Sequence, residues 1–179
     1  GSRFLNAILY NRGVLKVDEV MTINKAGAQM TNSGTITLSG DNLTITQAQD
    51  TQSFKNIGSI IVDTNYILYI TGGRFIPASS GSINGVLDVN STNFETGVIK
   101  DKTKLYMTNS KITGDVVNKG YMTVRGLTNG CSGTFSNDTG ATLRLEGIYD
   151  YASVFTFAKG FTNSGTIVGS DGFGFATVK

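Results

Sequence analysis

The sequence repeats one short pattern from end to end. The clearest copy is Met30–Leu38, in which an apolar residue is followed by Asn two positions later, Gly two positions after that, and then apolar residues at alternate positions. Other copies begin at Leu9, Phe54, Val116 and Phe161, one with an extra residue begins at Phe135, and two looser ones centre on Ile83–Gly85 and Phe94–Gly97. The glycines of neighbouring copies lie roughly 20–25 residues apart, and such a period predicts a fold that grows by stacking one unit on the next.

The length of the repeat selects among stacked folds. Strands of about three to five residues in a period in the low twenties are typical of one coil of a parallel β-solenoid, because a propeller blade or a TPR unit needs a longer period. The 23 Gly, set among Asn, Thr, Ser and branched apolar residues, favour short strands and tight turns over helices. We therefore expect an all-β fold, a right-handed parallel β-helix (β-solenoid) of about seven to eight coils of roughly 20–27 residues.

Alternation within the strands predicts which side chains form the core. A second strand pattern follows the first by about six residues, at Met21–Ile23, Leu43–Ile45, Leu68–Ile70 and Leu105–Met107. The side chains expected to face inward are Leu15, Val17, Ile36, Leu38, Ile60, Val62, Leu87, Val89, Met122, Val124, Leu143 and Leu145. Those expected to face outward are Lys16, Thr37, Ile61, Asp88, Thr123 and Arg144.

The Asn-x-Gly element has a structural interpretation. We expect its Gly to allow a positive φ at a sharp turn, and its Asn to bond to backbone and to the Asn of the next coil, about 4.8 Å away. The predicted structural ladder consists of Asn11, Asn32, Asn56, Asn118, Asn137 and Asn163.

Two segments interrupt the repeat. Gly72–Gly81 contains the only proline, Pro77, and is predicted to be a loop that projects from the solenoid, while Gly147–Tyr151 is a second insertion. Because no linker divides the chain, we expect residues 3–179 to form a single β-helix domain. Gly1 and Ser2 resemble a cloning scar, and we expect the domain to be a fragment of a longer protein.

Charge and composition argue against several classes of function. The net charge is only +2 and the basic residues are scattered, so we expect no nucleic-acid partner. No apolar run approaches the ~20 residues of a membrane span, so this segment is not expected to insert into a membrane. Cys131 is the only cysteine and there is no His, so we predict a small turn residue at position 131, no disulfide, no cofactor and no metal site.

Many parallel β-helices cleave polysaccharides, a chemistry that needs particular side chains. A hydrolase of the pectin type needs a Gly-His-Gly, which a chain without His cannot supply. A lyase needs clustered carboxylates, whereas the closest pairs here are Asp18 with Glu19 and, across coils, Asp63 with Asp88. Adjacent strand residues face opposite ways, so Asp18 and Glu19 are predicted to be solvated. We predict that the chain is not an enzyme.

Outward aromatic residues are the candidate contacts with a ligand. Tyr69 and Tyr106 point outward from second strands, and Tyr121 begins an outward position on its own coil. Exposed rings can stack on sugar faces while Asn, Thr and Asp bond to hydroxyls, so these three are possible glycan contacts. The alternative is that the rings only cover the solenoid.

The amino-acid sequences of Phe161–Ile167 and Met30–Ile36 resemble the repeats of bacterial secreted β-helix proteins, in particular filamentous-haemagglutinin-like and autotransporter adhesin passengers. The resemblance implies a right-handed β-helix that is secreted or held at the cell surface and serves as a stalk or adhesive surface. We therefore expect a non-catalytic structural and adhesive segment that attaches to a protein or glycan of a host or matrix surface. The alternative is a carbohydrate-binding or polysaccharide-cleaving β-helix, including the phage tail-spike type.

Overall fold

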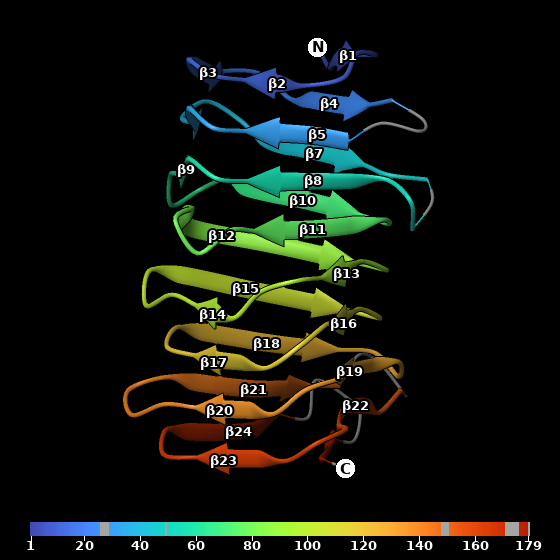
Figure 1. The fold of residues 1–179 in the computed structure, drawn as a ribbon, viewed down its shortest axis with the longest axis vertical. Coiled ribbons are helices and arrows are strands. Elements are labelled where there is room, and N and C mark those ends of the chain that lie inside the picture. Colours follow the sequence, from blue (N-terminus) through green and yellow to red (C-terminus); the bar gives the residue numbers. More distant parts are fainter. Residues whose placement is uncertain (26–28, 49, 148–150, 171–175, 179) are drawn as a thin grey trace.

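The chain folds into a β-solenoid of parallel strands. The computed structural model describes residues 1–25, 29–48, 50–147, 151–170 and 176–178, and within these it contains strands and turns but no helix. Every strand pairing in this part of the chain is parallel, and the strands stack into about eight turns (Figure 1). The prediction of an all-β parallel solenoid is confirmed.

The described residues form three sheets, of which sheet 1 is the largest and consists of a main path and a side arm. The main path contains β1 (Arg3–Leu5), β4 (Met21–Asn24), β7 (Leu43–Thr46), β10 (Ile67–Thr71), β12 (Ser82–Asn90), β15 (Thr103–Thr108), β18 (Tyr121–Arg125), β21 (Thr142–Glu146) and β24 (Thr166–Ser170). The arm contains β3 (Val14–Val17), β6 (Thr35–Leu38) and β9 (Ser59–Val62), and β9 joins it to β12.

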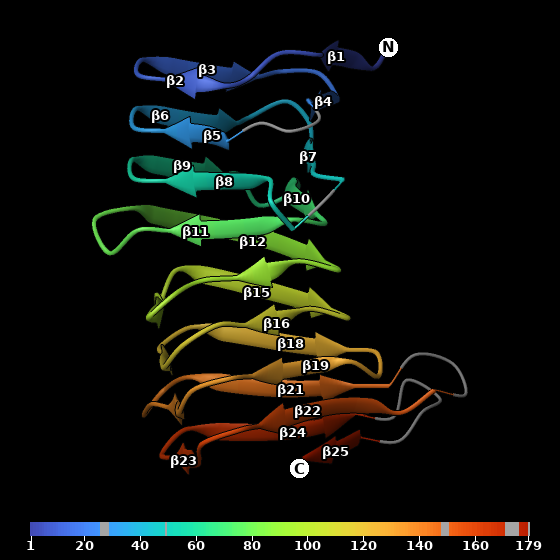
Figure 2. The same ribbon diagram turned by 45° about the vertical axis from the view of Figure 1, so that its right-hand side comes forward.

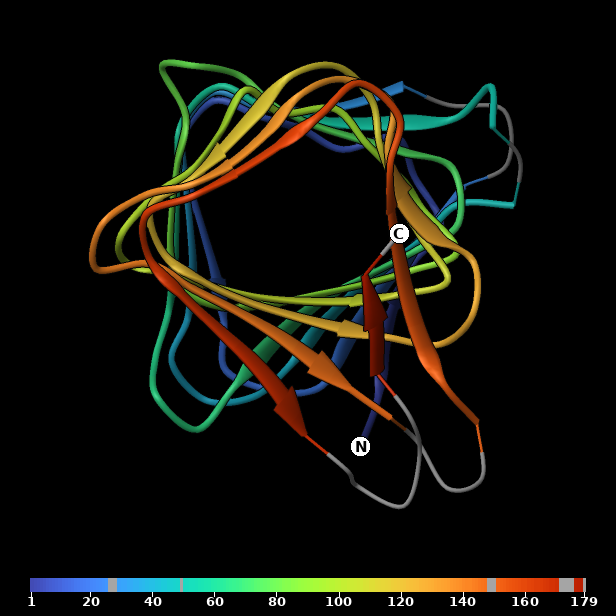
Figure 3. The same cartoon turned by 90° about the horizontal axis from the view of Figure 1, so that it is seen from below.

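Sheets 2 and 3 complete the wall of the solenoid, whose closed outline is seen along the stack in Figure 3. Sheet 2 contains β2 (Tyr10–Asn11), β5 (Gln29–Asn32), β8 (Ser53–Asn56), β11 (Arg74–Pro77), β13 (Asn93–Phe94), β16 (Lys111–Ile112), β19 (Asn129–Cys131), β22 (Ser153–Phe157) and β25 (Ala176–Val178). Sheet 3 contains β14 (Val98–Ile99), β17 (Val116–Asn118), β20 (Phe135–Asn137) and β23 (Phe161–Asn163).

The interior is filled by the alternate apolar side chains of these strands. All twelve side chains predicted to face inward lie in or against the core, and of these only Leu15 is partly exposed. Phenylalanines stack between coils: Phe54, Phe75 and Phe94 occupy equivalent positions, with neighbouring ring centroids 5.5 Å apart. Of the side chains predicted to face outward, Thr123 is only 1% exposed, because it lies in register between Tyr106 and Arg144.

The cross-section of the solenoid changes at β12. Before β12, an arm strand follows each Asn-x-Gly turn and a main-path strand comes after a further turn (Figure 2). After β12, the strand that follows the Asn-x-Gly turn belongs to the main path itself, since Met122 and Val124 pair with Leu105 and Met107. The second strand pattern predicted at four places corresponds to β4, β7, β10 and β15, which all belong to the main path.

One strand, β12, makes this change by turning a corner at Gly85. Its first residues pair with β9 and its last five with β10. Gly85 has a φ of 111°, and a Cβ there would lie 2.3 Å from the Val62 carbonyl oxygen. Residues 62–66 stand opposite this single residue, so the turn at residues 63–66 has no counterpart in the next coil. We call this turn the overhang.

The prediction that Gly72–Gly81 is a projecting loop is wrong. Residues 74–77 form β11, which pairs with β8 on one side and β13 on the other, and Phe75 is fully buried. Pro77 is tolerated because it ends the strand. The second predicted insertion lies largely outside the described residues, since positions 148–150 are not among them.

The interpretation of the Asn-x-Gly glycines also needs correction. Gly34 and Gly58 have ordinary φ angles, and Gly is required there because the backbones of successive coils approach closely. A Cβ at Gly58 would lie 2.0 Å from the Gly34 carbonyl oxygen. Of the glycines in the eight copies, only Gly140 and Gly85 have the predicted positive φ, 84° and 111°.

Candidate functional site

The predicted Asn residues form two ladders of three rather than one of six. Asn11 donates to Asn32, and Asn32 donates to Asn56, each at 2.7 Å. In the second ladder, Asn118 donates to Asn137 and Asn137 donates to Asn163, each at 2.8 Å. Each amide also bonds to a backbone carbonyl.

The gap between the two ladders coincides with the change of cross-section. Pro77 stands in register with Asn56, and Ile99 stands in register with Asn118, so neither position can extend a carboxamide ladder. A 170 Å³ pocket opens at this corner, lined mainly by apolar groups such as Ile83, Phe94 and Ile99. Lys100 lies at this pocket and donates to the Gly81 carbonyl at 2.6 Å.

A further polar ladder at another corner was not predicted. Thr92 N–H donates to the Ser110 hydroxyl and Ser110 N–H donates to the Asn129 side chain, both at 3.0 Å, and all three residues are buried. The hydroxyls and the amide also bond to nearby carbonyls. The sequence signal is a polar residue at the start of three neighbouring strands of sheet 2, just before β13 and β16 and at the first position of β19, at spacings of 18 and 19 residues.

The outer face of sheet 1 brings together two of the three predicted tyrosines. Tyr69 of β10, Asp88 of β12 and Tyr106 of β15 stand in register on neighbouring strands. Tyr121 lies on the same face at the start of β18, in register with Lys104 and Thr142. All three tyrosine side chains are half-buried.

A hollow of 310 Å³ lies beside this row, between the overhang and sheet 1. Its lining includes Asn65 and Tyr66 of the overhang, Val86 and Asp88 of β12, Tyr106 of β15 and Arg125 of β18. The hollow exists because the overhang is not stacked on a similar turn in the next coil. Tyr69 and Tyr121 do not line it.

Asp88 is the acidic group of the hollow. It is partly buried, and among the described residues no side chain or backbone N–H donates a hydrogen bond to its carboxylate. Burial raises the pKa of Asp88, and the positive charge of Arg125 opposes that shift. The carboxylate is therefore available to accept hydrogen bonds from a ligand.

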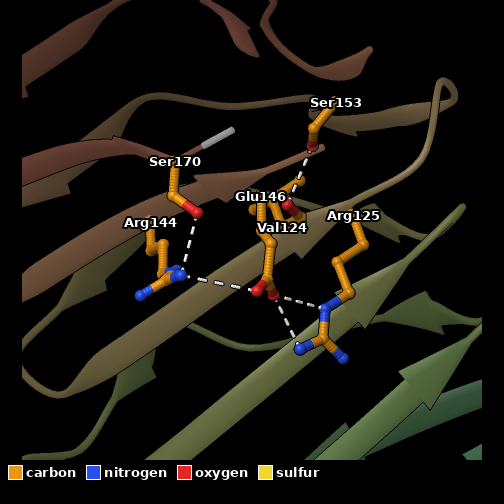
Figure 4. Close-up of polar contacts among 6 residues, drawn as sticks. All are labelled: Val124, Arg125, Arg144, Glu146, Ser153 and Ser170. Carbon is orange, nitrogen blue, oxygen red and sulfur yellow. Dashed lines mark hydrogen bonds and ion pairs between the residues drawn. The ribbon is translucent and has the colours of Figure 1, made fainter. Parts of the chain in front are cut away.

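Arg125 is held in place at the edge of the hollow by two neighbours. Its guanidinium lies 4.7 Å from the centre of the Tyr106 ring, a cation–π contact, and its Nε and Nη2 each lie 2.7 Å from Glu146 Oε2. Figure 4 shows Glu146 between Arg125 and Arg144, whose Nη2 lies 3.4 Å from Glu146 Oε1 and donates to the Ser170 hydroxyl at 2.8 Å. This network orients Arg125 and leaves its Nη1 free to donate.

The other candidate groups do not assemble into a reactive site. Asp63 is not in register with Asp88, whose neighbours are the two tyrosines, and Asp18 bonds to Lys16 at 3.0 Å. Within the described ranges, no three acidic, Cys or His side chains lie close enough to hold a metal ion. The prediction that Cys131 is a turn residue is wrong. Cys131 is the buried last residue of β19, and burial raises the pKa of its thiol.

Comparison with known proteins identifies no relative of this chain. No protein-family model, no curated protein and no solved structure matches the chain. In the part of the chain that the structure describes, no helix has the length and apolar character needed to cross a membrane.

Proposed function

We propose that this chain is a non-catalytic structural and adhesive segment of a protein that is secreted or displayed at a cell surface. The solenoid would act as a stiff support, and the outer face of sheet 1 would attach to a host or matrix surface. The resemblance of Met30–Ile36 and Phe161–Ile167 to repeats of filamentous-haemagglutinin-like and autotransporter adhesin passengers supports this proposal.

The observation that carries the proposal is the outer face of sheet 1 around Asp88. Tyrosine rings, a carboxylate to which no described residue donates a hydrogen bond, and a cation held by Glu146 lie together on adjacent strands there. Aromatic residues and arginine are the residue types that contribute most to binding at protein surfaces. The Asn ladder of sheet 3 and the stacked phenylalanines of sheet 2 join successive coils of the solenoid, so little ordering is needed on binding.

A solid-phase adhesion assay tests the proposal. The 179-residue chain is titrated over a layer of purified extracellular matrix and over cultured epithelial cells, and we expect saturable binding to at least one of them. Arg125→Ala should weaken that binding at least tenfold, while Lys55→Ala, on the exposed outer side of sheet 2, should leave it unchanged. Absence of saturable binding, or equal loss in both variants, would overturn the proposal.

A further inference from the structure

We propose that the hollow between the overhang and sheet 1 binds one unit of a neutral glycan through sugar hydroxyls and the Tyr106 ring. This inference rests on the adhesive function proposed above and names the chemical class of its partner. The hollow is formed where β12 replaces the turn at residues 63–66 by the single residue Gly85.

The size and shape of the hollow suit a small polar ligand. Its 310 Å³ is at the lower end of the range of about 300–1,000 Å³ found for small-molecule sites. Its floor comes from Val86 and Asp88 on β12, while the Tyr66 and Tyr106 rings come from the overhang and from β15. An apolar wall with a few polar groups is the arrangement that binds the two chemically different faces of a sugar ring.

The polar groups of the hollow complement a diol. When ionised, Asp88 can accept hydrogen bonds but cannot donate them, and no described residue donates one to its carboxylate. Arg125 can only donate, and Glu146 occupies its Nε and Nη2 but not its Nη1. Asn65 can do both. A sugar that presents neighbouring hydroxyls can donate to Asp88 and accept from Arg125 or Asn65 at the same time.

The charge of the hollow favours a neutral sugar over an acidic one. The positive charge of Arg125 is already paired with Glu146, whereas the Asp88 carboxylate has no bonded partner among the described residues. A uronate, sialate or sulfate placed here would meet the unpaired negative charge of Asp88. Acidic glycans are therefore expected to bind more weakly than neutral ones.

The structure also separates the three outward tyrosines. Only Tyr106 lines the hollow, and Arg125 fixes its ring at 4.7 Å. Tyr121 lies on the same face, is similarly buried and does not line the hollow. Tyr121 is thus a matched control for Tyr106.

A glycan array followed by calorimetry tests the inference. The labelled 179-residue chain is applied to an array of neutral glycans that end in glucose, galactose, mannose or fucose, together with uronate-, sialate- and sulfate-bearing glycans. We expect saturable binding to neutral members. By titration calorimetry with the best neutral ligand, D88N and Y106A should each weaken affinity at least tenfold, and Y121A should stay within twofold of the parent chain.

Folding is checked separately by circular dichroism and thermal melting, and D88N is expected to melt no lower than the parent chain at pH 7. Binding confined to acidic glycans, no glycan binding, or equal losses in Y106A and Y121A would overturn the inference. Adhesion to matrix that survives enzymatic removal of the glycans would overturn it too, but would leave the adhesive function standing. Glycan-array binding without matrix or cell adhesion would instead reject the adhesive function and keep the site.

Discussion

Asn32 donates through Nδ2 to Asn56 Oδ1 at 2.7 Å, although 24 residues separate the two in the sequence. Both side chains are fully buried, and Asn32 Nδ2 also bonds to the Ser59 carbonyl. A carboxamide can therefore bond to its counterpart in the next coil and to turn backbone at once. This relationship holds successive coils in register.

Replacing the middle residue of a ladder should be costly. Asn32→Ala would leave the buried Asn56 and the partly buried Asn11 and Ser59 without this partner, and we expect a loss of about 3 kcal/mol in the free energy of unfolding. Asn163→Ala, at an exposed ladder end, should lose less than about 1 kcal/mol. Urea denaturation measures both losses. Equal values would contradict the prediction, because the buried middle residue would then stabilise the fold no more than the exposed end residue does.

The close approach of successive turns predicts a strong effect at Gly58. In Gly58→Ala the new Cβ would lie 2.0 Å from the Gly34 carbonyl oxygen, so the backbone must move, at about 3 kcal/mol or more. Gly97→Ala is the matched control, because no atom lies within 4 Å of a Cβ built there and its φ is ordinary. Thermal melting of the two variants decides the point, and similar melting temperatures would contradict it.

A column of residues with left-handed backbone conformation predicts that Gly is a more stable replacement than Ala at position 91. Residues 72, 91, 109 and 126 follow the last residues of neighbouring main-path strands, and all have positive φ, but Ser91 (φ 53°) and Asn109 (φ 46°) are not glycine. Ser91→Gly should be more stable than Ser91→Ala by about 1 kcal/mol, since only Ala keeps the strain of a Cβ. Both variants lose the bond from the Ser91 hydroxyl to Asn90, so denaturation curves isolate the backbone effect. An Ala variant as stable as the Gly variant would contradict the prediction.

The raised pKa of Asp88 predicts a pH-dependent stability difference. Folded protein holds the Asp88 proton more tightly than unfolded protein, so its contribution to stability falls as pH rises from about 3.8 through the higher folded pKa. The groups that face it are Arg125 of β18 and the tyrosines Tyr66, Tyr69 and Tyr106. Asp88→Asn should therefore melt higher than the parent chain at pH 7, with the difference vanishing below about pH 3.

Asp18 is the control of opposite sign. A hydrogen bond from Lys16 lowers the pKa of Asp18, so its contribution is present above about pH 3.8 and is lost as pH falls through the lower folded value. Asp18→Asn should thus melt no higher than the parent chain at pH 7. Melting curves of both variants from pH 3 to pH 7 test the pair, and an Asp88→Asn chain that melts lower at pH 7 would refute the burial argument.

Because β11 belongs to the wall of the solenoid, a substitution at its buried residue should destabilise the fold as a core substitution does, although the sequence predicted a loop there. Phe75 stacks between Phe54 and Phe94, and Phe75→Ala should lose about 4 kcal/mol in the free energy of unfolding. A residue in a projecting loop would lose less than about 0.5 kcal/mol. Urea denaturation distinguishes these values by a wide margin.

Alternation explains why the core was predictable. Residues such as Ile36 and Leu38 alternate with polar neighbours, and a strand has only two faces, so one correctly placed residue assigns the rest. The prediction for residues 72–81 was wrong because Gly and Pro77 favour a loop locally, while β11 pairs with β8, 21 residues earlier, and with β13, 19 residues later, and this pairing overrides the local preference. The polar ladder from Thr92 to Asn129 could not be predicted from a repeated residue type, because its members are Thr, Ser and Asn while performing the same role.

The sequence by itself determined the repeat, the parallel solenoid, the inward side chains and the identity of the Asn positions, because each depends on periods carried by neighbouring residues. Only the tertiary structure decided where the coils change shape. The corner consists of residues 62–66 in one coil and of Gly85 alone in the next. This mismatch in length cannot be predicted from either segment separately, since it exists only when the two coils are stacked. That mismatch creates the overhang and the hollow, and it separates Tyr106 from the two tyrosines that the sequence could not distinguish from it.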